Sequence, residues 1–149
     1  MPILDPLRVA EHLHGHLGWL AAIALVHPAV LLRQPSRRAH ASVALSVAVT
    51  TLAGALGVAL YGPYRDRLRQ PIFVHAPTVG YLFERKEHLA FAAILLSWTG
   101  AISYAGAQWA EGSVRGSLRK AARVAFLASA VFAIVTAILG TFVAAYKTF

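Results

Sequence analysis

Four long apolar runs, separated by polar links, restrict what this chain can fold into. The runs cover residues 17–32, 40–61, 89–109 and 121–146, and none of them contains Asp or Glu. A helix needs about 20 mostly apolar residues to cross the hydrocarbon layer of a membrane. Inside that layer a helix satisfies its backbone hydrogen bonds within itself. The sequence therefore predicts an all-α integral membrane protein.

The first and third links are short, so the helices that they join should be antiparallel neighbours, and the second link is the only substantial one. We predict a single domain over residues 1–149, an up-down-up-down four-helix bundle with helices at about 6–32, 39–61, 79–110 and 119–146. Gly62-Pro63 is a strong helix-breaking pair. It predicts an extramembrane loop at about 62–78.

Composition supports a membrane protein and excludes several kinds of site. Only 13% of the residues are charged, about half the share typical of soluble domains. The chain has no cysteine, which excludes disulfides and thiolate metal sites. Its formal net charge of +8 comes from cations at the edges of the apolar runs. Cations at those positions typically face lipid phosphates, so nucleic acid is not the expected partner.

Orientation follows from the distribution of charge. We call side A the end with both termini and the 62–78 segment, and side B the end with the first and third links. Lys and Arg, which decide orientation, are tied at seven on each side, but five of the six acidic residues lie on side A. Side B also places its cations in two short links. We therefore expect a bacterial cytoplasmic (inner) membrane protein with side B in the cytoplasm and both termini periplasmic.

The chain carries seven histidines, an excess for so apolar a sequence. His16 and His27 are eleven residues apart, which places them within about 20° of one another on a helix and about 16 Å apart along its axis. One helix should thus present an imidazole near each membrane surface on the same face. His14 should point about 200° away from His16, and we expect it to take no part in a site.

Each of these two histidines has a counterpart at similar depth on another helix. His16 and His88 each precede an apolar run near side A, and His27 and His40 lie near side B. Two neutral imidazoles from facing helices are what six-coordinate b-type haem requires. We predict one or two haem b groups, held by His16 with His88 and by His27 with His40. His12, one turn from His16, is the alternative ligand.

This arrangement of histidines resembles the four-helix membrane b-type cytochromes. The resemblance is architectural, covers the whole chain and rests on no specific motif. The spacing of eleven is shorter than is usual in two-haem members. The resemblance implies electron transfer through bis-His haem, as a membrane subunit of a larger redox complex rather than a stand-alone enzyme. It also implies a quinone or a periplasmic cytochrome as the redox partner.

Two other hypotheses fit the same residues. Histidines near a membrane surface often hydrogen-bond lipid, water or backbone, as they would in a cofactor-free accessory subunit of a larger complex. In addition, His12-x-x-x-His16 and Glu84-x-x-x-His88 form two pairs that are four residues apart on separate helices. Histidine and carboxylate at that spacing can bind zinc or iron. The sequence leaves these alternatives open.

Overall fold

The computed structural model describes residues 5–34 and 36–146, and this part of the chain is almost entirely helical. Four of its helical segments are long and apolar enough to cross a membrane, which confirms the predicted all-α class with four such helices. The long helices are α1 (Pro6–Leu31), α2 (Ala39–Tyr64), α4 (Pro77–Trp109) and α5 (Gly112–Ala145). A π-helical turn, η1 (Arg65–Arg69), and a short helix, α3 (Gln70–His75), join α2 to α4.

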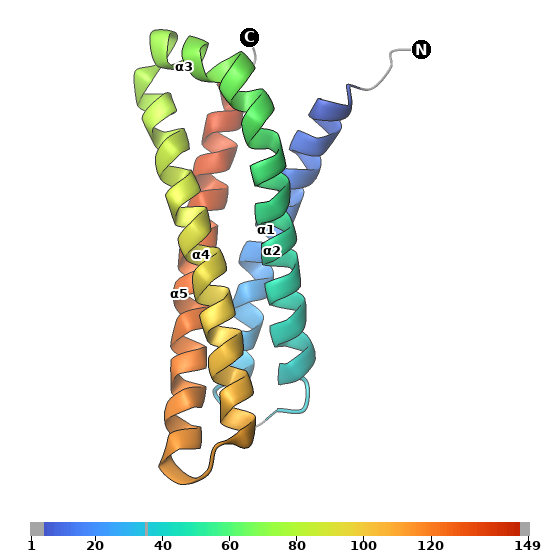
Figure 1. The fold of residues 1–149 in the computed structure, drawn as a ribbon, viewed down its shortest axis with the longest axis vertical. Coiled ribbons are helices and arrows are strands. Elements are labelled where there is room, and N and C mark those ends of the chain that lie inside the picture. The colour runs from blue at the N-terminus through green and yellow to red at the C-terminus, as the bar shows by residue number, and fades with distance from the viewer. Residues whose placement is uncertain (1–4, 35, 147–149) are drawn as a thin grey trace.

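The four long helices lie side by side (Figure 1). The start of α1, the short α3 and the end of α5 lie at one end of the molecule, which is side A. The α1–α2 and α4–α5 connections lie at the other end, side B. α5 packs against α4 and α1, and α2 packs against α1 and α4. The helices therefore form a ring in the order α1, α2, α4, α5, with space for side chains at its centre.

The helix ends have simple local causes. Asp5 caps α1, and its carboxylate accepts a hydrogen bond from the Leu7 amide at 3.0 Å, which satisfies one of the amides that the first turn leaves unpaired. Pro6 occupies the first helical position, where its fixed φ costs nothing. At side B, Gly112 has a φ of +54°, a conformation that favours glycine. That residue turns the chain from α4 directly into α5.

The structure differs from the sequence-based prediction at residues 62–78. The predicted loop is wrong, because α2 continues through Gly62-Pro63 to Tyr64 and leads directly into η1 and α3. A proline inside a helix removes one backbone hydrogen bond and kinks the helix without always ending it. Tyr64 stacks on Phe83 of α4 with ring centroids 3.7 Å apart, and Ile72 of α3 is fully buried. This packing against α4 holds the segment in helical form.

Hydrogen bonds from small polar side chains connect the helices. The Ser46 hydroxyl of α2 donates to the Ala24 carbonyl of α1 at 2.7 Å, and the Ser129 hydroxyl of α5 donates to the Ala93 carbonyl of α4 at 2.6 Å. Two indole N–H groups donate to threonine hydroxyls on other helices, Trp19 to Thr141 and Trp98 to Thr51. Such bonds, together with close packing of small residues, are what associates helices in lipid.

The outer faces of the bundle are apolar. Ile102 and Leu95 of α4 are 67% and 62% exposed, and other large apolar side chains on all four long helices are similarly exposed. A soluble monomer rarely exposes apolar surface on this scale. The centre instead holds small residues around a few large ones, among them Leu25 and Phe126, which are fully buried. This distribution is typical of helices surrounded by lipid.

Gly100 of α4 allows α5 to approach closely, and this generates a stability prediction. A Cβ added at Gly100 would lie 2.9 Å from ring atoms of Phe126, a side chain that cannot move aside because it is fully buried. We expect Gly100→Ala to lower the free energy of unfolding by about 1–3 kcal/mol. Thermal unfolding of the purified protein in detergent measures this effect.

Gly116→Ala on α5 is the matched control, because nothing lies within 4 Å of the added methyl group. Alanine is the better helix former by about 1 kcal/mol, so this variant should be neutral or slightly more stable. Equal destabilisation of both variants would contradict the packing of Gly100 on Phe126.

Candidate functional site

One concave region lies in each half of the bundle. The first, which we call the side A cavity, has a volume of about 410 Å³ and is lined by α1, α2, α4 and α5. The second, the side B pocket, has a volume of about 650 Å³ and is lined by the α1–α2 link and by α2, α4 and α5. Both volumes fall in the range of small-molecule sites.

The side A cavity has walls of small residues and a polar opening. Most of its wall residues are glycine, alanine and threonine from all four long helices, including Gly18, Ala21, Thr50, Ala53, Gly54, Ala90, Ala93, Thr136, Ala137 and Gly140. Trp19 and Ile94 are its larger apolar members. Five ionisable residues also line it, namely Glu11, His12, His14, His16 and Lys86. Three imidazoles from α1 therefore border one cavity between the helices.

His12 and His16 differ from the other histidines in their surroundings. Five of the seven histidines hydrogen-bond protein groups through Nδ1, namely His14, His27, His40, His75 and His88. Within residues 5–34 and 36–146, the rings of His12 and His16 have no protein hydrogen-bond partner. Both rings line the side A cavity, so their nitrogens are the ones available there to a ligand.

His14 lies closer to the bundle than the sequence indicated. Its Nδ1 is 3.1 Å from the Ala53 carbonyl of α2, and because a carbonyl only accepts, Nδ1 carries the proton in this bond. A Cβ added at Gly57 would lie 2.9 Å from His14 Cε1, so the imidazole packs where α2 has a glycine. His14 meets α2 because α1 contacts both α2 and α5, and two faces of α1 therefore meet the bundle. That His14 takes no part in a site stays a prediction.

The structure brings only one member of the predicted side A pair to the cavity. His16 and His88 are both exposed, but only His16 lines the cavity, and His88 donates from Nδ1 to the Glu84 carbonyl, one turn earlier on α4, at 2.8 Å. The residues that α4 contributes to the lining include Lys86 and Ala90, and His88 is not among them. Haem ligation by His16 with His88 stays a prediction.

The side B pair also contacts separate partners. His27 Nδ1 lies 2.8 Å from the Ser42 hydroxyl of α2. His40 Nδ1 lies 3.0 Å from the Tyr104 hydroxyl of α4, and the two rings meet edge to face with centroids 5.1 Å apart. His27 thus belongs to the α1–α2 interface and His40 to the side B pocket. Haem ligation by His27 with His40 likewise stays a prediction.

The alternative non-haem site would combine His12, His16, Glu84 and His88. The Glu84 carboxylate accepts a hydrogen bond from Arg69 at 3.0 Å in an exposed ion pair. Within the described part of the chain, no group of three or more His, Asp or Glu side chains is placed to hold a metal ion.

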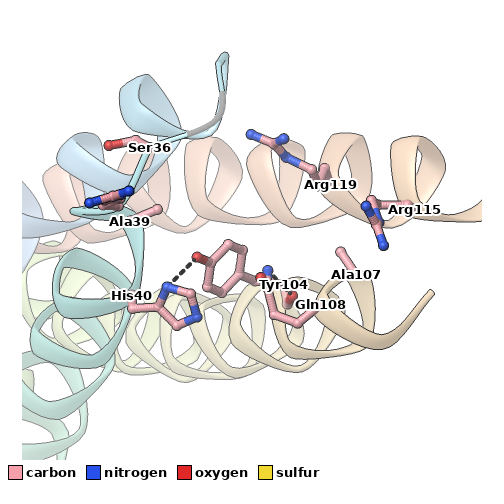
Figure 2. Close-up of a pocket in the computed structure, with 9 residues that line it drawn as sticks. Ser36, Ala39, His40, Tyr104, Ala107, Gln108, Arg115 and Arg119 are labelled. Atoms are coloured by element: carbon pink, nitrogen blue, oxygen red, sulfur yellow. Dashed lines mark hydrogen bonds between the residues drawn. The ribbon is translucent and has the colours of Figure 1, made fainter. Parts of the chain in front are cut away.

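The side B pocket is basic and rich in hydrogen-bond donors. Figure 2 shows Arg115 and Arg119 on α5, Tyr104 and Gln108 on α4, and His40 at the start of α2 around one opening. Arg37 completes its set of cations. Sequence reasoning counted these arginines for orientation only and did not single out Tyr104 or Gln108. The sequence did contain a signal for this pocket. Arg115 and Arg119 are four residues apart and so share one helix face, and the same holds for Tyr104 and Gln108.

Comparison with family models, with curated proteins and with solved structures finds no match to this chain. Its function is therefore argued from its own residues.

The bond between Tyr104 and His40 generates a second prediction. Tyr104→Phe removes the only side-chain hydrogen bond that the structure records for its hydroxyl, and we expect the free energy of unfolding to fall by about 0.5–1.5 kcal/mol. Denaturant or thermal unfolding in detergent measures the change. Tyr81→Phe is the control, because the Tyr81 side chain is exposed. An equal effect of the two substitutions would show that the Tyr104–His40 bond contributes nothing.

Proposed function

We propose that this protein crosses the bacterial cytoplasmic membrane as an up-down-up-down bundle, with side B in the cytoplasm and both termini periplasmic. Four helices of sufficient length and apolarity support the crossing. The grouping of the connections at two opposite ends supports the alternation of direction (Figure 1). The numbers of Lys and Arg are equal on the two sides, so the orientation rests on two other features. Side B holds its cations in two short links, and five of the six acidic residues lie on side A.

Within this bundle, the side A cavity is the proposed haem site, and the protein is proposed to act as a b-type cytochrome subunit in electron transfer. The observation that carries this proposal is the position of His12 and His16. They lie one turn apart, both line the cavity, and neither ring has a protein partner within the described residues. Neutral imidazole is a common axial ligand of haem iron and carries no charge into the membrane.

The residues of the cavity fit a flat macrocycle with one axial imidazole from α1. Most of its walls are small side chains from all four helices, with Trp19 and Ile94 as larger members, and the small side chains leave room between the helices. A haem bound there would supply the one-electron chemistry. His16 is the proposed ligand, with His12 as its alternative. A bis-His site would also need the exposed His88 to turn inward, so the proposal is limited to one haem at side A.

A cofactor-free accessory subunit is the second candidate, and a specific observation favours it. Five of the seven imidazoles already hydrogen-bond the protein, three of them to groups on another helix, namely His14, His27 and His40. Polar bonds of this kind join membrane helices without any cofactor. In that case the exposed apolar faces would pack against partner subunits as well as lipid.

The proposed topology predicts where reporters will be found. Fusions at Gln70 and at the C-terminus should report the periplasm, and fusions at Ser36 and Ser113 should report the cytoplasm. Paired alkaline phosphatase and fluorescent protein fusions measure this. Opposite locations for Gln70 and the C-terminus would contradict the four crossings, whereas an exchange of all four sides would correct only the orientation.

The haem proposal predicts a Soret band in protein purified from cells supplied with haem precursor. His16→Ala should remove at least about nine-tenths of that absorbance if His16 is the sole axial ligand from α1. His75→Ala is the matched control and should change nothing, because its ring is exposed and bonds the Pro71 carbonyl. His12→Ala tests the alternative ligand, and His88→Ala tests bis-His ligation through a shift of the reduced bands.

Folded protein without Soret absorbance, before and after reconstitution with haemin, would overturn the haem proposal. The accessory-subunit function would then stand. Elemental analysis of the same samples separates the haem protein and the accessory subunit from the His/Glu metal hypothesis. That hypothesis requires about one zinc or iron per chain without a Soret band.

A further inference from the structure

We propose that the side B pocket binds a phosphate group, carried either by an anionic phospholipid or by a soluble phosphate ester. The pocket lies at the opposite end of the bundle from the side A cavity and shares no lining residue with it. This inference is therefore independent of the haem proposal.

The first argument is uncompensated charge. Arg37 from the α1–α2 link and Arg115 and Arg119 from α5 line the same pocket, and no carboxylate lines it. Within the described residues, none of these three arginines forms an ion pair. Like charges around one concave surface repel each other, more strongly there than in bulk water. An anion in the pocket would replace that repulsion with attraction.

The second argument is the arrangement of the guanidinium groups. Arg115 Nε donates to the Ala110 carbonyl at 2.8 Å, so the end of α4 fixes this side chain at the edge of the pocket. Its two terminal amino groups remain as donors, with no partner in the part of the chain that the structure describes. Arg119, one turn further along α5, is partly buried. Planar guanidinium groups bind phosphate through paired N–H bonds.

The neutral groups of the pocket add further donors. In the bond between the Tyr104 hydroxyl and His40 Nδ1, one of the two groups donates. If the hydroxyl donates, neutral His40 carries its proton on Nε2; if Nδ1 donates, the hydroxyl proton is left. Either way the pair keeps one donor beyond the bond between them. Gln108 uses one amide hydrogen on the Tyr104 carbonyl at 3.1 Å and keeps the other.

The size and position of the pocket indicate what is attached to the phosphate. A volume of about 650 Å³ exceeds what a bare phosphate ion needs, so the pocket has room for a group attached to the phosphate. The pocket lies where α4 ends and where α2 and α5 begin (Figure 2), which is the depth of lipid head-groups if the bundle crosses a membrane. Both an anionic lipid and a soluble phosphate ester can reach this position.

The test measures thermal unfolding of the full-length protein in nanodiscs. One arm uses phosphatidylcholine nanodiscs with increasing glycerol 3-phosphate, and the other uses phosphatidylcholine nanodiscs with increasing phosphatidylglycerol. A ligand that binds only the folded state raises the midpoint as its concentration exceeds the Kd. We expect a rise in at least one arm. Arg119→Gln and Arg115→Gln should each shift the half-effective concentration about tenfold upward, since each removes a charge-assisted bond.

Arg67→Gln is the matched control, because it removes the same charge from an exposed residue at side A. It should leave the response unchanged. A rise with glycerol 3-phosphate alone identifies a soluble ester, and a rise with phosphatidylglycerol alone identifies a lipid head-group. No rise in either arm, or an equal response in Arg119→Gln and Arg67→Gln, overturns the proposal. Arg37→Gln, at the α1–α2 link, replaces either α5 variant that fails to fold.

Discussion

Hydrocarbon offers no hydrogen-bond partners, and under the proposed membrane crossing this constraint explains most of the structure. A chain in such surroundings must satisfy its backbone groups within helices, and the four long apolar runs form helices accordingly. Polar side chains face the same constraint and turn towards neighbouring helices. Ser46, Ser129 and His14 each bond a backbone carbonyl on another helix. The polar bonds that satisfy these groups are therefore the same bonds that join the bundle.

Small residues have two consequences that depend on position. At Gly100 the missing side chain lets the Phe126 ring of α5 contact α4, and the core there is closely packed. Towards side A, most of the interior lining is glycine, alanine and threonine, with Ile94 of α4 against Gly54 of α2 as a larger member, and a cavity of about 410 Å³ remains. The proposed haem site thus arises from the same residue types that pack the rest of the bundle.

Periodicity and apolar length were sufficient to predict the four long helices. They were not sufficient to predict which side chains of each helix would meet the neighbouring helices. Asp5-Pro6 correctly marked the start of α1. Gly62-Pro63 did not end α2, because Tyr64 stacks on Phe83 of α4. The local sequence could not show this contact, since the two residues are far apart in the chain. Spacing placed His12 and His16 on one face of α1, and both line the side A cavity, but His14 lines it as well. Spacing could not show that His14 would meet α2 or that His88 would face outward, because helix spacing fixes relative angles only. Tyr104 became visible as a partner of His40 only when α2 and α4 were placed together.

Both proposals assume that the bundle crosses a membrane. Spin labels at single introduced cysteines test this crossing, because the chain has no cysteine of its own. Labels at Leu95 and Ile102, which are exposed apolar positions within α4, would be compared with a label at the exposed Arg67 by power-saturation EPR in nanodiscs. If the bundle crosses the membrane, we expect the labels at positions 95 and 102 to be highly accessible to oxygen and poorly accessible to a water-soluble nickel chelate. We expect the reverse for the label at position 67. Membrane crossing would be contradicted if the labels at positions 95 and 102 were as accessible to the nickel chelate as the label at position 67.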